Sequence, residues 1–122
     1  MNSKALLILC VIFMVSCSDD LANDSAVKLV TIYINTAKTQ CNDDGLSLEE
    51  TSSYLTDANI EFTEPQCGYI TGANYPAVCG GVTSNIYIFT IQEPDLLESE
   101  NLGFAGLSSL DSSLGYETVN CS

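Results

Sequence analysis

Four segments of the chain have the apolar pattern of β-strands. Residues 28–34 (KLVTIYI) and 85–91 (NIYIFTI) are rich in β-branched and aromatic residues, as buried strands are. Residues 60–64 (IEFTE) alternate apolar with polar positions, and residues 116–120 (YETVN) form a shorter, weaker run at the end of the chain. The pattern therefore predicts two interior strands and two edge strands.

A helix is predicted between the first two strands, over residues 48–58. Ser47 and Glu50 form a capping box, in which each side chain bonds the backbone N–H of the other residue. Asn59 is placed to end the helix. The apolar face of this helix comprises Leu48, Thr51, Leu55 and Ala58.

A second helix is predicted between Pro94 and Gly103, because proline favours the first helical position and glycine the position after the last. Residues 65–84 are rich in glycine and are expected to form a long connection. The resulting order, β-α-β-β-α-β, predicts an α+β fold of the ferredoxin-like split βαβ type. In that fold the sheet is antiparallel, residues 28–34 and 85–91 are its central pair, and both helices cover one face.

The strand pattern also predicts an interaction face. If Val30, Ile32 and Ile34 face the helices together with Ile86 and Ile88, the opposite face exposes aromatic side chains. An apolar patch of this kind is a candidate surface for a protein partner or a second copy of the chain. The alternative is that a loop such as 65–84 covers it. The predicted face consists of Tyr33, Tyr87 and Phe89, beside Ile91.

The beginning of the chain has the pattern of an export signal. Lys4 precedes eleven apolar residues, Ala5 to Val15, which as a helix would extend about 16 Å and are too short to cross a bilayer core of about 30 Å. The residues at the end of this run, Met14-Val15-Ser16-Cys17, resemble the lipobox of bacterial lipoprotein precursors. The resemblance implies that residues 1–16 are removed as a signal peptide and that Cys17 carries the lipid.

This resemblance also implies a location and a domain organisation. The protein is expected in the bacterial cell envelope, attached to a membrane through lipid on Cys17, and Ser18 favours the outer membrane over the inner one. Residues 17–27 are polar and acidic and are interpreted as the lipidated N-terminus and a flexible tether. Residues 28–122 then form a single small α+β domain.

Four cysteines remain once Cys10 is removed with the signal peptide and Cys17 is lipidated. An even number in a small exported domain predicts two disulfides. On the predicted fold, Cys41 pairs with Cys67 or Cys79, and Cys121 pairs with the other. The sequence does not choose between these pairings.

Charge and missing residue types narrow the function. Sixteen acidic residues, three lysines, and no arginine or histidine leave a mature chain with 2 − 16 = −14 formal charges after Lys4 is removed. Because no basic stripe exists to neutralise phosphates, a nucleic-acid partner is not expected. A Ser-His-Asp site is excluded, and no cofactor or metal is expected. Asn42-Asp43-Asp44-Gly45 is no EF-hand, since Gln40 and Thr51 would occupy positions that need acids.

The sequence therefore predicts a lipid-anchored envelope protein that is not an enzyme and that binds another protein or itself. Two alternatives remain open. One is a small hydrolase that uses only carboxylates, such as Glu61 and Glu64. The other is an inhibitor of a secreted enzyme.

Overall fold

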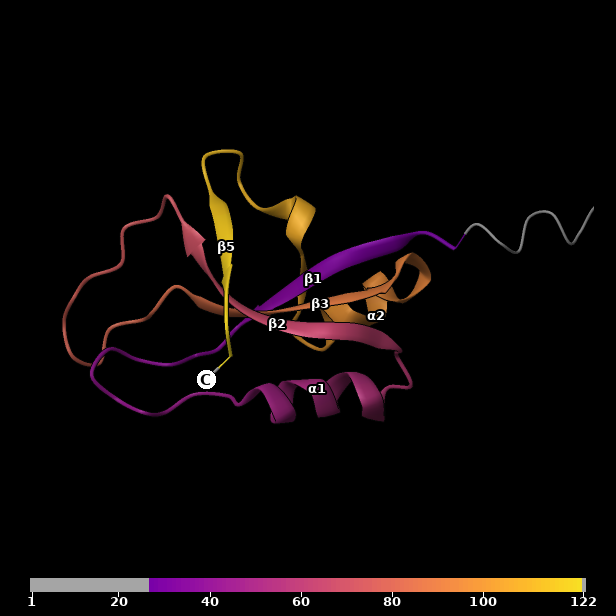
Figure 1. Ribbon diagram of the computed structural model, residues 1–122, viewed down its shortest axis with the longest axis horizontal. Helices are drawn as coiled ribbons and strands as arrows, with labels where there is room; N and C mark the ends of the chain where they lie inside the picture. The colour runs from indigo at the N-terminus through magenta and orange to yellow at the C-terminus, as the bar shows by residue number, and fades with distance from the viewer. Residues whose placement is uncertain (1–26, 122) are drawn as a thin grey trace, which may run out of the picture.

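The computed structural model describes residues 27–121, which form one antiparallel sheet with two helices (Figure 1). The predicted signal peptide, Cys17 and the tether up to residue 26 lie outside the described residues. The sheet has the strand order β4-β1-β3-β2-β5. The strands are β1 (Leu29–Asn35), β2 (Phe62–Thr71), β3 (Asn85–Gln92), β4 (Ala105–Gly106) and β5 (Gly115–Val119), and the helices are α1 (Leu48–Asp57) and α2 (Leu96–Asn101).

The α+β class, the antiparallel sheet and the pairing of the two most apolar strands are confirmed, but the ferredoxin-like topology is wrong. The sheet has five strands, and its last strand lies at the opposite edge from the one expected. β5 pairs with β2, for example Tyr69 opposite Glu117, whereas the two-residue β4 lies beside β1. The disulfide from Cys67 in β2 to Cys121 after β5 holds the C-terminal strand at this edge.

β2 is twice as long as the predicted strand 60–64 and includes residues 65–71, which were expected to be loop. Proline usually interrupts a strand because it lacks an N–H donor. Here Pro65 lies in a β-bulge, where the register with β3 shifts between Thr63 and Gln66 and Glu64 has a φ of 43°. An unpaired bulge residue needs no ladder hydrogen bond, so β2 continues beyond the proline.

α1 begins at its predicted cap, and both helices end next to the predicted residues, but α2 does not begin at Pro94. Ser47 Oγ accepts a hydrogen bond from the backbone N–H of Glu50 at 3.0 Å. α1 ends at Asp57, two residues before Asn59, which has a φ of 59°, and α2 ends at Asn101, two residues before Gly103, which has a φ of 109°. α2 itself is shorter than predicted, because Glu93–Asp95 around Pro94 form a 3₁₀ turn before it.

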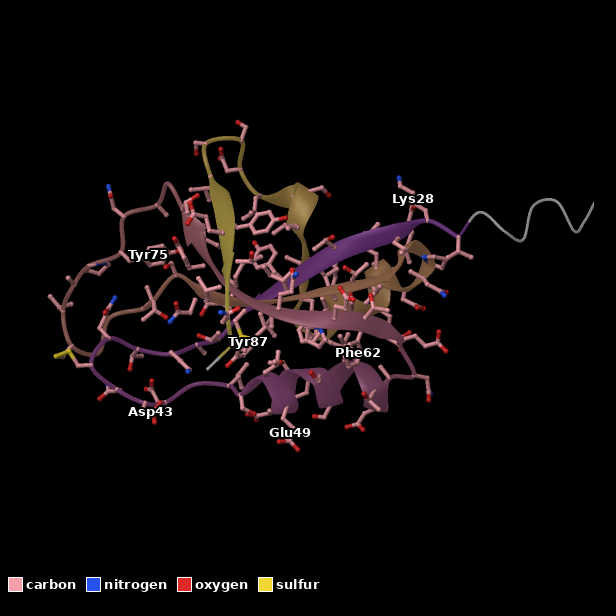
Figure 2. The ribbon with its side chains drawn as sticks, in the orientation of Figure 1. Lys28, Asp43, Glu49, Phe62, Tyr75 and Tyr87 are labelled. Carbon is pink, nitrogen blue, oxygen red and sulfur yellow. A yellow bond between two sulfur atoms is a disulfide. The ribbon has the colours of Figure 1, made fainter. Side chains whose placement is uncertain are left out.

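The core lies between one face of the sheet and the two helices. The register pairs Ile32 with Phe89 and Ile34 with Tyr87, and opposite residues in an antiparallel pair point to the same face. Phe89 is fully buried, and the rings of Phe62 and Phe104 meet it edge-on at centroid distances of 5.3 and 5.6 Å. Figure 2 shows Phe62 and Tyr87 in the layer between the sheet and α1.

On the second face of the sheet, β5 comes close to β2 at Gly68. Ile86 and Ile88 lie on this face and are 1% and 2% exposed. A Cβ placed on Gly68 would collide with the carbonyl oxygen of Glu117 and lie 3.1 Å from Ile88 Cδ1. The backbone of β5 therefore passes directly over Gly68, and in Figure 1 it crosses β2 steeply.

Candidate interaction site

The structure does not form the predicted interaction face of Tyr33, Tyr87 and Phe89. Tyr87 and Phe89 point into the core, and only Tyr33 lies on the second face, where its neighbour across the strands is Ile88. The Tyr87 hydroxyl donates a hydrogen bond to the carbonyl oxygen of Leu46 at 2.9 Å, which joins the sheet to the segment before α1. The error arose because β3 is apolar at consecutive positions, so its sequence does not reveal which residues face the helices.

A different surface site lies at the outer edge of β1. β4 pairs only with Ile32 and Tyr33, after which Leu107–Ser109 form a 3₁₀ turn that stays beside β1 without pairing as a strand. A hollow of about 480 Å³ opens where β4 would have continued. This β1-edge groove is bounded by Lys28–Thr31 along β1, by Leu107 and Ser108, and by the side chains of Leu96 and Tyr116.

The backbone of β1 is available along this groove. The N–H of Glu93 donates to the carbonyl oxygen of Lys28 at 2.8 Å, and the N–H of Thr36 donates to that of Asn85 at 3.0 Å. Backbone groups alternate between the two sides of an antiparallel strand, so the even-numbered residues of β1 face β3. The odd-numbered Leu29 and Thr31 consequently direct their backbone groups toward the groove. Leu29 lies three residues before Ile32, the first residue of β1 that pairs with β4.

The side chains of the groove are mainly apolar and include no carboxylate. Leu29 is 60% exposed and Tyr116 is 43% exposed, although both are large apolar residues. The one cation, Lys28, lies 3.5 Å from the carboxylate of Glu93, and both side chains remain largely in solvent. An exposed ion pair of this kind contributes little to stability.

The carboxylates considered for catalysis do not share a hollow. Glu61 lines a depression of about 570 Å³ at the end of α1 with Phe62 and Ile60, and Glu64 is absent from its lining. Within residues 27–121 no three His, Cys, Asp or Glu side chains are arranged to hold a metal ion. No helix in this part of the chain is long and apolar enough to cross a membrane.

The four predicted disulfide cysteines form two bridges, and the structure selects the pairing. Cys41 is bonded to Cys79 and Cys67 to Cys121, with Cα separations of 5.0 and 5.2 Å. The first bridge joins two connections at one end of the sheet, where Thr39 also pairs with Val82. The second attaches the C-terminal end of the chain to β2.

The acidic turn before α1 uses one carboxylate to hold a loop. The N–H and the hydroxyl of Thr39 both donate to Asp44, each at 2.8 Å. These hydrogen bonds favour the ionised form and lower the pKa of Asp44 below 3.8. Hydrogen bonds from Ser113 lower the pKa of Asp111 in the same way.

Tyr69 and Glu117 form a polar contact between β2 and β5. The Tyr69 hydroxyl donates a hydrogen bond to the Glu117 carboxylate. This bond, together with the negative charge of Glu117, raises the pKa of Tyr69 above 10.0. The sequence offered no signal for the pair, because the two residues are 48 positions apart.

Comparison with protein-family models, with curated proteins and with solved structures gives no match for this chain.

Proposed function

We propose that this protein is a lipid-anchored module of the bacterial envelope, attached through Cys17, that binds another protein in the β1-edge groove. The observation that carries the binding role is the groove itself, where apolar side chains lie beside a strand edge with no partner strand at Leu29. Exposed strand edges of this kind are templates for pairing with another chain. The proposed role is non-enzymatic.

The position of the groove is consistent with an anchor at Cys17. The groove begins at Lys28, eleven residues after the predicted lipid attachment. Eleven residues reach at most about 40 Å when fully extended. The groove would then work close to the membrane surface, in the outer membrane by preference, and meet membrane-proximal proteins.

Self-association through this groove has less support than binding of a different protein. Two mature chains would each bring a formal charge of −14 to the interface. Like charges repel within a Debye length, which is about 8 Å at physiological ionic strength. The hydrolase alternative has less support as well, because Glu61 and Glu64 do not line one hollow.

The anchor is tested by the intact mass of the exported protein. We expect the mature chain to begin at residue 17 and to carry the added mass of its acyl chains. The Cys17→Ala variant should lose that mass and leave the membrane fraction. A mature wild-type protein without acyl chains would refute the anchor.

The binding role is tested with a photo-crosslinking amino acid placed in turn at Leu29 and at Leu97. These leucines are a matched pair, since both are strongly exposed and only Leu29 lines the groove. In envelope preparations, the probe at Leu29 should give a discrete adduct that the probe at Leu97 does not. Equal adducts at both positions, or none at Leu29, would contradict a specific binding groove.

A further inference from the structure

We infer that the groove receives an extended, positively charged segment of its partner, which joins the sheet as an additional strand beside β1. This inference rests on the proposed binding function and specifies the partner's chemistry. Its first support is the direction of the β1 backbone. Leu29 and Thr31 point their backbone groups outward, and an incoming strand can pair with them as β4 pairs with Tyr33.

The length of the free edge sets the length of the segment. β1 borders the groove from Lys28 to Thr31, which corresponds to about 13 Å of extended chain. The 3₁₀ turn Leu107–Ser109 lies beside the inner part of this edge, so a partner segment pairs mainly at Leu29. Because so short a strand makes few backbone hydrogen bonds, side-chain contacts must supply much of the affinity.

The groove provides apolar contacts on both sides of such a strand. Residues on a strand alternate between its two faces, so Val30 lies on the helix side of the sheet, near Leu96, and Leu29 lies on the other. Leu107 and Tyr116 border the same groove. A bound segment with apolar residues at its central positions can therefore pack side chains against both faces.

The net negative charge of the protein favours basic residues on either side of the apolar centre of the partner segment. The mature chain carries −14, and no acidic residue lines the groove. Basic side chains that extend beyond the apolar centre would meet the negative field of the whole protein, including Glu93, which lies against Lys28. An acidic segment, or a second copy of this chain, would be repelled.

The probe for this inference is a labelled peptide of sequence KVKVTVK, added to the purified full-length lipoprotein in a non-ionic detergent. Fluorescence anisotropy should show saturable binding that weakens as salt is raised. The charge-reversed peptide EVEVTVE should bind at least about tenfold more weakly. Amide exchange of the bound protein should slow at Leu29 and Thr31.

Two substitutions at one position separate backbone pairing from side-chain packing. Leu29→Pro removes an outward-facing N–H that the β1–β3 ladder does not use, and edge strands tolerate proline. Leu29→Ala removes the side chain and keeps the N–H. We expect Leu29→Pro to weaken peptide binding about tenfold more than Leu29→Ala, and Leu97→Ser to leave it unchanged.

A peptide N-methylated at its central valine provides the same test without changing the protein, in case Leu29→Pro fails to fold. Equal binding of the KVKVTVK and EVEVTVE peptides, or binding without protection of the Leu29 amide, would overturn the strand-addition inference. Dimerisation that protects the Leu29 amide before any peptide is added would also overturn it, in favour of a second copy. The crosslinking comparison of Leu29 with Leu97 is independent of these outcomes and judges the binding function by itself.

Discussion

Phe89 and Tyr116 are both aromatic residues of the sheet, but they have opposite environments. Phe89 makes edge-on contacts with two other rings inside the core, and Tyr116 borders the β1-edge groove in solvent. Burial of a large aromatic side chain is among the strongest single contributions to folding. The two residues are therefore expected to differ sharply in what they contribute to stability.

Substitution of Phe89 by alanine should lower the free energy of unfolding by about 3–5 kcal/mol, because it removes a buried ring and leaves a cavity. Tyr116→Ala serves as the exposed aromatic control and should cost about 1 kcal/mol or less. Urea denaturation followed by circular dichroism measures both. Similar losses for the two variants would contradict the burial of Phe89.

Asp44 should make stability depend on pH in the acidic range. Its pKa in the folded protein is lowered by the two hydrogen bonds from Thr39. A lowered pKa means that the carboxylate stabilises the fold above its ordinary value of 3.8, and that this contribution is lost as the pH falls through the folded-state pKa.

Asp44→Asn should consequently destabilise the protein at neutral pH and have little effect once the wild-type carboxyl is protonated. Thermal unfolding between pH 7 and about pH 2 measures the difference. Asp43→Asn, at the neighbouring exposed position, is the control for the removal of one surface charge. A constant difference between Asp44→Asn and wild type at every pH would be inconsistent with the hydrogen-bonded carboxylate.

At the scale of elements, β5 depends on its links to β2. It pairs with β2 from Cys67 to Thr71, and the Cys67–Cys121 bridge follows immediately after the paired residues. Gly68 permits the close approach, since any side chain there would meet the backbone of β5. At Gly68 the backbone of β5 also comes close to the side chain of Ile88, which is buried.

Replacing Cys67 and Cys121 together by serine should destabilise the protein by about 4 kcal/mol in the chain-entropy model, because the bridge spans 54 residues. Amide exchange should accelerate first in Gly115–Val119. The matched control is the Cys41→Ser/Cys79→Ser variant, which removes the other bridge, spanning 38 residues. It should lose a comparable stability while β5 keeps its protection, and loss of β5 protection in both variants would contradict a local role for the Cys67–Cys121 bridge.

Over the whole molecule, the excess of negative charge opposes compaction. Sixteen acidic residues face three lysines, and the one ion pair among the described residues is exposed. Repulsion of this kind acts over about 30 Å at 0.01 M salt and about 8 Å at physiological ionic strength. Salt should therefore stabilise this protein through screening alone.

Raising sodium chloride from about 10 mM to about 150 mM should raise the melting temperature by a few degrees, as measured by differential scanning calorimetry. A quadruple variant with Glu49, Glu50, Glu98 and Glu100 changed to Gln is the control, since it removes four exposed charges from the two helices. Its salt response should be smaller than that of wild type. An equal response would indicate that ion binding or hydration, instead of charge repulsion, underlies the effect.

Local sequence signals determined much of the fold. Ser47, Asn59 and Gly103 mark helix ends in the sequence and in the structure, because capping depends on a few neighbouring residues. The apolar runs at 28–34 and 85–91 located the central strands, and the even cysteine count predicted two bridges. The export signal and the lipobox at Cys17 remain predictions from the sequence, since they lie outside the described residues.

Only the tertiary structure determined the register between strands, the identity of the edge strands and the position of the β1-edge groove. β3 is buried on both faces, so its sequence has no alternation, and only the pairing of Ile32 with Phe89 fixes which residues face the helices. The edge chosen by β5, the disulfide partners and the β1-edge groove all depend on contacts between residues far apart in the chain. A one-residue difference in register transfers every side chain of a strand to the other face, which is why Tyr87 and Phe89 lie in the core and not on the predicted aromatic surface.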